Sequence, residues 1–429
     1  MPRASFRYSS RTRILRALGL LFGLILLIDT LSLLTTYHRL TSSPAPPPPL
    51  PTDQRIFIAS IHWNNAAILN AHWSAALLEL VTQLGPQNVY VSIYESGSWD
   101  DTKDALRRLD AELEKLGVAR TVTLDTVTHA EHIANAPSLD SPPSPGWLTT
   151  TTTSISPSGQ KETIKKNELR RIPYLATLRN RSLAPLFFND TTTTPKFDKL
   201  LFLNDVTFTS SLISLLLSTR DGDYAAACSL DFSHPPHYYD TFALRDFAFS
   251  PTTSSVFPYF GARESRRAML RGEPVPVRSC WNGVVVFDAS PFYVEGGGLG
   301  FRGVEDGLAE RHVEGSECCL VHVDNPLSGT RGVWVNPKVR VGYSVEAGEE
   351  VRSERWLGGV GGLVGGVWRE RMGRVAGGWK RWSDQRKVRG RVEAWKREGM
   401  ALGEERREEG VGCLIDEMQV LRENGWAHV

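Results

Sequence analysis

The sequence predicts an α/β fold, a parallel sheet with covering helices, preceded by a single transmembrane helix. The first sign is a series of short apolar runs typical of buried strands, "RIFIASI" (55–61), "NVYVSIY" (88–94) and "RTVTL" (120–124). The second is the spacing of large apolar residues between these runs, every three or four residues over 69–84 and 106–116, as in amphipathic helices. Strands that alternate with helices form parallel sheets, whose ligands bind beyond the carboxyl ends of the strands. The third sign is an apolar run near the N-terminus.

The overall charge argues against nucleic acid as a partner. Of 429 residues, 49 are Lys or Arg and 48 are Asp or Glu, which gives a net charge of +1. No overall positive field attracts nucleic acid, so a charged ligand must be bound by local groups.

The N-terminal segment predicts a membrane anchor. Residues 1–13 form a basic, arginine-rich tail, and residues 14–34 form an apolar run close to the roughly 20 residues that cross a bilayer. Asp29 interrupts this run near its far end, where an acid costs less. The arginines predict a cytoplasmic N-terminus and a single-pass type II topology, with the rest of the chain in a secretory lumen. A cleaved signal peptide is the alternative.

A proline-rich stem is expected over residues 35–54, because "TSSPAPPPPLP" cannot form helix or sheet. We expect it to be a semi-extended spacer that holds a globular domain away from the membrane. This layout is common among Golgi enzymes that act on glycans, and it also suits other anchored luminal proteins.

The turns after the first two strands carry the first candidate ligand contacts. The turn "SIHWNNA" has no glycine, so the dinucleotide-binding motif is missing and a nicotinamide enzyme is unexpected. Asn64 in this turn and Glu95 in the next, "YESGSWDD", are candidate donor contacts, and Gly97 permits close approach of a backbone. An ordinary polar turn is the alternative.

Two features follow in the middle of the chain. Residues 135–163 are dense in Pro, Ser and Thr without periodicity, which predicts a mobile surface insert. The next segment predicts a helix that carries Arg179 and Arg181. Because residues two apart do not share a helical face, we expect at most one of these arginines to bind a phosphate.

The stretch "LLFLNDVTF" (200–208) places Asp205 directly after a buried strand. Such an acid is often a structural cap. In a luminal protein, however, sugar transfer uses nucleotide sugars, whose diphosphate can be neutralised by a hard divalent cation held by oxygen ligands. We therefore expect Asp205 to bind Mn2+ or Mg2+.

Several further motifs occur in order: "YDTFALRD" (239–246), "CWNG" (280–283) and "SECCLVHVD" (316–324). With "FLNDV" (202–206) and "RIPYLATLRNRSLAPL" upstream, they make residues 55–343 resemble the cryptococcal α-1,3-mannosyltransferase-type family of fungal Golgi glycosyltransferases. The resemblance implies a GT-A-like fold with a Rossmann-like nucleotide-binding half. It also implies transfer of mannose from GDP-mannose to a mannoside acceptor, with an α-1,3 linkage.

The resemblance assigns roles at the site. Asp205 matches the metal-binding acid of the family, while Asn204, expected near the donor, stands where many enzymes of this fold carry another acid. His322 is a candidate final metal ligand on an expected late strand, and a packed core histidine is the alternative. Apart from the resemblance, Glu317 and Asp240 are catalytic candidates, since a carboxylate can stabilise positive charge at an anomeric carbon; a surface acid is the alternative for Glu317.

Trp281, Asn282 and Arg245 are the candidate sugar or acceptor contacts. An indole can stack on a sugar face, and an amide can bind hydroxyls in pairs. A core tryptophan is the alternative for Trp281.

The five cysteines suit an oxidising lumen, and there is no C-x-x-C pair to suggest a metal cluster. A bridge from Cys280 to Cys318 or Cys319 is one expectation. The sequon at Asn189 is the candidate glycosylation site, because the one at Asn180 lies within the expected helix.

Residues 344–429 form a tail rich in Gly, Trp and charged residues. Its glycines predict a poor helix in the first part, since each costs about 1 kcal/mol in a helix interior. No chemistry can be assigned to it.

Two functions of different classes follow. One is a metal-dependent mannosyltransferase anchored in the Golgi membrane. The other is a catalytically inactive luminal glycan-binding or scaffold protein with the same fold. The asparagine at position 204 is the feature that supports this second function.

Overall fold

The computed structural model describes residues 5–42, 46–141, 144–155, 161–188, 196–294 and 298–429. Its centre is a ten-stranded sheet with the order β3-β2-β1-β6-β11-β7-β13-β10-β9, in which β8 pairs with β7. The strands are β1 (Ile56–His62), β2 (Val89–Glu95), β3 (Ala119–Leu124), β6 (Lys199–Leu203), β7 (Ala226–His234), β8 (His237–Tyr238), β9 (Arg245–Asp246), β10 (Val275–Ser279), β11 (Val284–Asp288) and β13 (Val333–Gly342).

The α/β prediction is confirmed, with a sheet that is mixed rather than wholly parallel. Strands β3, β2, β1 and β6 are parallel, whereas β11 runs antiparallel to both β6 and β7. The order β3-β2-β1 followed by a later strand is that of a Rossmann-like half.

Helices cover both faces of the sheet. Along β1, Ile56 and Ile58 join a core with α3 (Ser74–Leu84), α4 (Thr102–Lys115) and α7 (Ser210–Leu217). Phe57 and Ala59 join the opposite core with α6 (Arg171–Phe188), because successive side chains of a strand point to opposite faces. The other helices are α1 (Ser5–Thr41), α2 (Ala66–Ile68), α5 (His129–Ala134), α8 (Arg263–Arg271), α9 (Asp306–Ala309), α10 (Glu317–Asp324), α11 (Val345–Arg352), α12 (Gly359–Ala376) and α13 (Gly378–Ala401).

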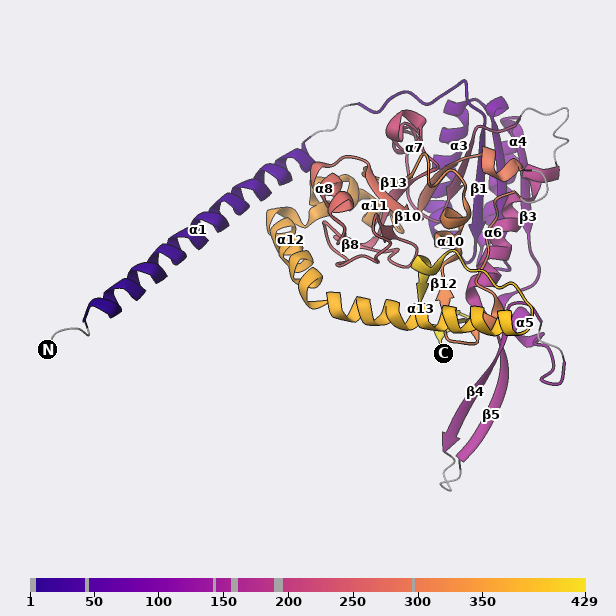
Figure 1. Ribbon diagram of the computed structural model, residues 1–429. Helices are drawn as coiled ribbons and strands as arrows, with labels where there is room; N and C mark the ends of the chain where they lie inside the picture. Colours follow the sequence, from indigo (N-terminus) through magenta and orange to yellow (C-terminus); the bar gives the residue numbers. More distant parts are fainter. Residues whose placement is uncertain (1–4, 43–45, 142–143, 156–160, 189–195, 295–297) are drawn as a thin grey trace.

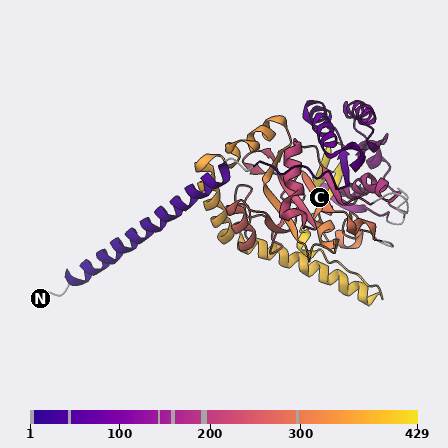
Figure 2. The same cartoon turned by 90° about the horizontal axis from the view of Figure 1, so that it is seen from above.

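Helix α1 projects from the globular part as a long rod (Figures 1 and 2). The described residues contain one helix long and apolar enough to cross a membrane, Arg13–Thr41, with a mean hydropathy of 2.3. Its last turns pack on the globular part, where Leu33 is 5% exposed. Ser214 of α7 donates a hydrogen bond to the carbonyl of Pro48. The expectation of a spacer is therefore wrong, because the end of α1 and the segment after it both contact the globular part.

The insert contains regular structure. Strands β4 (Trp147–Ile155) and β5 (Lys161–Leu169) form an antiparallel hairpin that extends from the body (Figure 1). The prediction of an irregular insert over 135–163 is wrong for these residues, because its threonines are β-branched and favour strands.

The C-terminal tail is part of the globular fold. Helices α12 and α13 run along it, and β14 (Leu414–Ile415) pairs with β12 (Glu314–Gly315); β15 (Gln419–Arg422) and β16 (Gly425–His428) form a final hairpin. The prediction of a poor helix is wrong because the glycines permit close packing. A Cβ on Gly366 of α12 would lie 2.4 Å from the carbonyl oxygen of Phe257.

Two disulfides, Cys228–Cys280 and Cys319–Cys413, cross-link the fold, and Cys318 is a buried free thiol. The expected bridge from Cys280 to Cys318 or Cys319 is wrong. Cys280 lies beside Cys228 of β7 instead, and Cys319 of α10 is bonded to Cys413 of the C-terminal tail. The spacing of the cysteines in the chain does not reveal that these segments are neighbours.

Candidate functional site

The candidate site lies at the ends of central strands of the sheet, where the parallel strands β1 and β6 end and the antiparallel strand β11 begins. Leu203, the last residue of β6, pairs with Val284, the first residue of β11. The loop that precedes β11 is thereby placed beside Asn204 and Asp205, and the backbone N–H of Asn204 donates to the carbonyl of Gly283 at 2.9 Å. The topology therefore joins "NDV" and "CWNG", which lie far apart in the chain.

Asp205 is partly buried at this edge and faces the end of β1. The Nδ2 of Asn65 donates a 2.8 Å hydrogen bond to its Oδ2. Burial raises the pKa of Asp205, although the Asn65 bond and the guanidinium of Arg179 act in the opposite direction. The carboxylate therefore sits where an added cation would stabilise its charge.

Asn204 and Trp281 bind each other. The Nε1 of Trp281 donates to Oδ1 of Asn204 at 3.1 Å, and the Asn204 carbonyl accepts from Nε1 of Trp73 at 2.9 Å. Trp281 is 2% exposed and packs against the rings of Phe202 and Phe301. The prediction that Trp281 stacks on a sugar is therefore wrong, because its indole belongs to the core.

Asn282 shapes the loop before β11. Its backbone is left-handed, with a φ of 60°, and its side chain is fully buried. Its Oδ1 accepts from the backbone N–H of Trp281 at 3.1 Å, and its Nδ2 lies 3.5 Å from Asp231. Gly283 follows with a φ of 80°, and a Cβ there would lie 2.8 Å from Val341. The predicted sugar contact by Asn282 is contradicted by this burial.

Arg179 and Glu317 form a buried ion pair beside Asp205. The Nε of Arg179 donates to Oε1 of Glu317 at 3.0 Å, and the residues are 7% and 2% exposed. The guanidinium lies 4.3 Å from the ring centroid of Trp281, and its Nη1 is buried without a partner among the described residues. Arg179 therefore has a donor to spare for a ligand. Glu317 is its counter-ion and not an open catalytic group, which corrects its predicted role.

Arg181 points away from Arg179, as its helical spacing predicts. Its Nη1 donates to the hydroxyl of Tyr94 at 2.5 Å and lies 3.4 Å from Asp125, with the side chain 47% exposed.

Asp231, on β7, is a candidate that we did not select from the sequence, although "YAAACSLDF" shows an acid near the end of an apolar run. Its Oδ2 accepts from the hydroxyl of Tyr343 at 2.9 Å, and its Oδ1 accepts from the backbone N–H of Asp240 at 3.2 Å. Burial and then the charge of Asp240 raise the pKa of Asp231 to about 7. Asp231 is fully buried, and carboxyls with a raised pKa are common at functional sites. Asp240 itself is partly exposed.

Arg245 is a structural residue, which corrects its predicted acceptor role. It is 2% exposed, and its guanidinium donates to four backbone carbonyls, those of Phe242, Leu244, Gly412 and Cys413. It thereby holds the C-terminal segment on the globular part.

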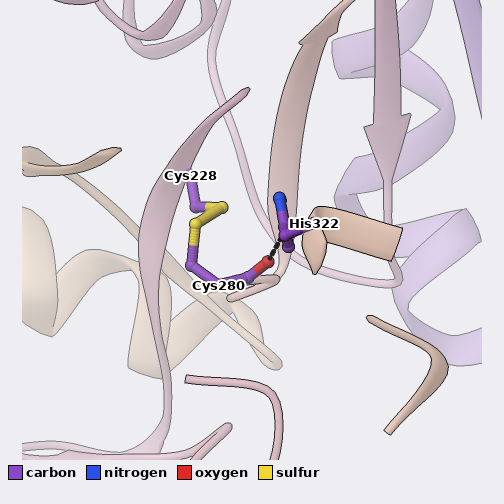
Figure 3. Close-up of side chains that lie close together, drawn as sticks. All are labelled: Cys228, Cys280 and His322. Carbon is purple, nitrogen blue, oxygen red and sulfur yellow. Dashed lines mark hydrogen bonds between the residues drawn. A yellow bond between two sulfur atoms is a disulfide. The ribbon is translucent and has the colours of Figure 1, made fainter. Parts of the chain in front are cut away.

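His322 is also structural and lies on helix α10, not on a strand. Figure 3 shows it beside the Cys228–Cys280 disulfide. Its Nε2 lies 2.6 Å from the carbonyl of Cys280, and its ring stacks on Phe287 at 5.3 Å. These three side chains are close enough to hold a metal, but both sulfurs are consumed by the disulfide. The prediction of His322 as a ligand beside Asp205 is wrong.

The burial of His322 predicts a pH dependence. Burial lowers its pKa to about 4, below the unfolded value of about 6.5, so stability is lost as pH falls from about 6.5 to 4. Between pH 7.5 and pH 5, we expect the unfolding free energy of the wild type to fall by about 2 kcal/mol more than that of His322→Gln. Urea titrations of the full chain at both values measure this. The surface variant His237→Gln is the control, and equal losses in wild type and His322→Gln would contradict the prediction.

Asn64 and Glu95 hold the turns that follow β1 and β2. Asn64 has a φ of 52°, and its Oδ1 accepts from the backbone N–H of Trp99 at 3.1 Å. Glu95 is fully buried, accepts from the backbone N–H of Ser98 and lies 3.8 Å from the Nζ of Lys103. Both side chains support loops, which leaves no direct donor contact assigned to either.

Buried polar atoms without partners gather beside these turns. None of the described residues forms a hydrogen bond with Nε1 of Trp63, with either ring nitrogen of His129 or with the hydroxyl of Tyr174. The His129 ring stacks on Trp63 at 4.3 Å and meets Tyr174 edge-on at 5.4 Å. Because buried polar groups are nearly always hydrogen-bonded, this cluster points to a polar ligand. Trp63 and Tyr174 lie in "SIHWNNA" and "RIPYLATLRNRSLAPL", but nothing in the sequence brings them together with His129.

The carboxylate of Asp205 can supply one of the several ligands that a divalent cation needs. Among the described residues, Asn65 alone donates a side-chain hydrogen bond to this carboxylate, to Oδ2, which leaves Oδ1 for a cation. The described carboxylates do not gather three oxygens around one point. A hard cation here would complete its shell with donor phosphates and water, as Mg2+ commonly does.

The predicted glycosylation site, Asn189, lies outside the described residues. Asn180, in the other sequon, exchanges two hydrogen bonds with the backbone of Phe301, at 2.8 and 2.9 Å.

Known proteins resemble this chain in sequence and in structure. The sequence model of the family described as "Cryptococcal mannosyltransferase 1" matches residues 55–324. The alpha-1,3-mannosyltransferase CMT1 of Cryptococcus neoformans is 28% identical over 198 residues, 42% of this chain and 41% of that protein, so the match spans less than half of the relative. The solved structure of mannosyltransferase PcManGT from Pyrobaculum calidifontis, in complex with GDP-Man and Mn2+, is 15% identical with a TM-score of 0.34, over 72% of this chain and 64% of that one. At that TM-score the likeness carries no argument about the site.

Proposed function

The chain belongs to the family of cryptococcal mannosyltransferase 1, and from that premise we propose that it transfers mannose from GDP-mannose to a mannoside acceptor, forming an α-1,3 linkage. The observation that carries this proposal is the setting of Asp205. It is a carboxylate whose pKa is raised by burial, near the charge of Arg179, at the carboxyl end of β6. Ligands of such sheets bind at this edge.

Asp205 would hold Mn2+ or Mg2+ in this proposal. The cation would stabilise the negative charge that gathers on the departing diphosphate. Arg179 has a buried Nη1 without a partner among the described residues, and this group can donate to a phosphate oxygen. Glu317 keeps the guanidinium in place through the 3.0 Å bond to its Nε.

The nucleotide of the donor would bind beside the ends of β1 and β2. There the unpartnered atoms of Trp63, His129 and Tyr174 offer hydrogen bonds and a stacked pair of rings. The acceptor would bind on the side of Asp240, which is partly exposed and would take up a proton from a sugar hydroxyl, with the buried Asp231 behind it.

The chain would work as a single-pass type II protein of the Golgi membrane, with its globular part in the lumen. The arginine-rich N-terminus and the apolar helix of 29 residues support this orientation.

A transfer assay separates this function from the alternative of an inactive glycan-binding protein. The chain in neutral detergent is incubated with labelled GDP-mannose, Mn2+ and a panel of short mannosides. Labelled product supports the enzyme. Binding of donor and acceptor without product across the panel would favour the inactive protein, in which Asn204 has become a structural partner of Trp281.

The variant Tyr174→Phe tests the nucleotide site. We expect GDP-mannose to bind about fivefold more weakly, since a hydrogen bond contributes about 1 kcal/mol, while the free chain loses no stability because the hydroxyl has no partner among the described residues. Calorimetric titration and a thermal melt measure the two effects. Tyr224→Phe is the matched control, because its buried hydroxyl donates to Leu217 at 3.1 Å and its loss should lower stability alone. Unchanged affinity in Tyr174→Phe would contradict the assignment.

A further inference from the structure

The apolar helix α1 is joined to the C-terminal part of the chain by an ion pair. Arg371 of α12 donates from Nη1 and Nη2 to the two carboxylate oxygens of Asp29, at 2.8 and 2.7 Å. Asp29 is the acidic residue within the apolar run 14–34. The free energy needed to place this carboxylate in a membrane helix is thus offset by a bidentate ion pair with an arginine from a distant segment.

This pair sets the depth of α12 relative to a membrane. Asp29 precedes Leu34, the end of the predicted span, by five residues, which is about 8 Å along a helix at 1.5 Å per residue. The guanidinium of Arg371 therefore lies about 8 Å inside that end of the span, at the depth of the luminal leaflet. Helix α12 lies beside the end of α1 that meets the globular part (Figure 1).

An apolar stripe runs along the exposed side of α12 and the start of α13. Its members recur every three or four residues and are strongly exposed: Trp368 (40%), Met372 (68%), Val375 (86%), Trp379 (77%) and Trp382 (50%). We call these five residues the tryptophan stripe. Large apolar side chains at such exposure are costly in water and mark an interaction surface.

Cations flank the tryptophan stripe. The guanidinium of Arg371 lies 4.8 Å from the ring of Trp368, and that of Arg386 lies 5.2 Å from the ring of Trp382. Arg369 is exposed as well. Tryptophan next to arginine or lysine on one helix face is the composition of segments that lie in a membrane interface.

We propose that the tryptophan stripe lies in the luminal leaflet of the same bilayer that α1 crosses, so that the globular part is held against the membrane at two points. The proposal rests on the membrane anchoring by α1 given above. Continuity with α1 through Asp29 and the flanking cations together select a lipid surface as the occupant. The candidate site would then have a fixed orientation relative to the membrane.

A lipid-quenching experiment on the full chain tests this proposal. Single cysteines at Val375, at Leu20 of α1 and at Leu402 beyond α13 are labelled with an environment-sensitive fluorophore; these residues are 86%, 77% and 68% exposed. The native cysteines are bridged or buried, which favours labelling at the new position. The chain is placed in vesicles of phosphatidylcholine and phosphatidylserine, with or without nitroxide on the acyl chains.

We expect nitroxide lipid to quench the labels at Leu20 and Val375 and to spare the one at Leu402. Quenching at Leu20 without quenching at Val375 would overturn the proposal and leave the anchoring intact. Absence of quenching at both would overturn the anchoring and the proposal together. A shift of the Val375 label that depends on protein concentration in detergent would identify a second copy of the chain as the occupant, and would also overturn it.

A paired variant keeps the test independent of folding. Trp379→Ser with Trp382→Ser should lower quenching of the Val375 label several-fold, while Trp426→Ser, an exposed tryptophan on the final hairpin, should leave it unchanged. Equal quenching in both would show that the stripe does not contact lipid.

Discussion

Replacing Asp205 by asparagine is expected to slow mannosyl transfer by about a hundredfold to a thousandfold, or about 2.7 to 4 kcal/mol in activation free energy. The amide keeps the shape of the side chain, and its oxygen can still accept the 2.8 Å bond from Asn65. What is lost is the negative charge that holds a cation on the departing diphosphate. Because burial already raises the pKa of Asp205, the uncharged variant should fold at least as readily.

Transfer rates as a function of Mn2+ concentration, together with a thermal melt, measure both effects. Asp288→Asn is the matched control, because Asp288 also ends a strand but lies at the opposite edge of the sheet, where it pairs with Arg331 at 2.7 Å. It should keep its transfer rate. Near-normal transfer by folded Asp205→Asn would reduce this acid to a strand cap worth about 1 kcal/mol of stability.

Arg179→Met is expected to lower the free energy of unfolding by about 3 to 5 kcal/mol, because it leaves the carboxylate of Glu317 buried without its counter-ion. Both residues are more than nine-tenths buried, at 7% and 2% exposure. Urea titration of the full chain measures the loss. Arg107→Met, which breaks the exposed pair with Asp104, is the control and should cost less than about 1 kcal/mol.

The double variant Arg179→Met with Glu317→Leu separates structure from function. Replacing a buried ion pair by apolar residues of similar volume is often neutral, so the double variant should recover most of the lost stability. Transfer should stay low, since the proposed phosphate donor is absent. If transfer returned with stability, Arg179 would be a packing residue and its place in the donor site would be wrong.

Strands β1, β2 and β6 of the Rossmann-like half could be predicted from the sequence because they are buried on both faces. Such strands read as short apolar runs between turns, and "RIFIASI" became β1, Ile56–His62. The apolar helix α1 was predictable for a similar reason, since an apolar run of this length is typical of a continuous helix long enough to cross a membrane. Asp205 could be selected because parallel strands bring their ends to one edge.

Several predictions failed where burial hides the usual signal. The segment of His322 is buried on all sides, so its apolar run carries no period that distinguishes helix from strand. The glycines of α12 argued against a helix, yet Gly366 lets it approach the backbone of Phe257. Trp281 and Arg245 look like ligand contacts by residue type, but their surroundings in the fold are core atoms and backbone carbonyls.

By itself, the sequence determined the local order of this protein: an apolar N-terminal helix, alternating strands and helices, and an acid at the end of β6. Local order depends on residue type and short spacing, which the chain carries directly. Tertiary structure alone decided which distant groups meet: Asn65 with Asp205, Arg179 with Glu317, and Asp29 with Arg371. The physical reason is that each of these contacts joins segments more than one hundred residues apart, so the pairing depends on strand order and on helix packing, which no local pattern records.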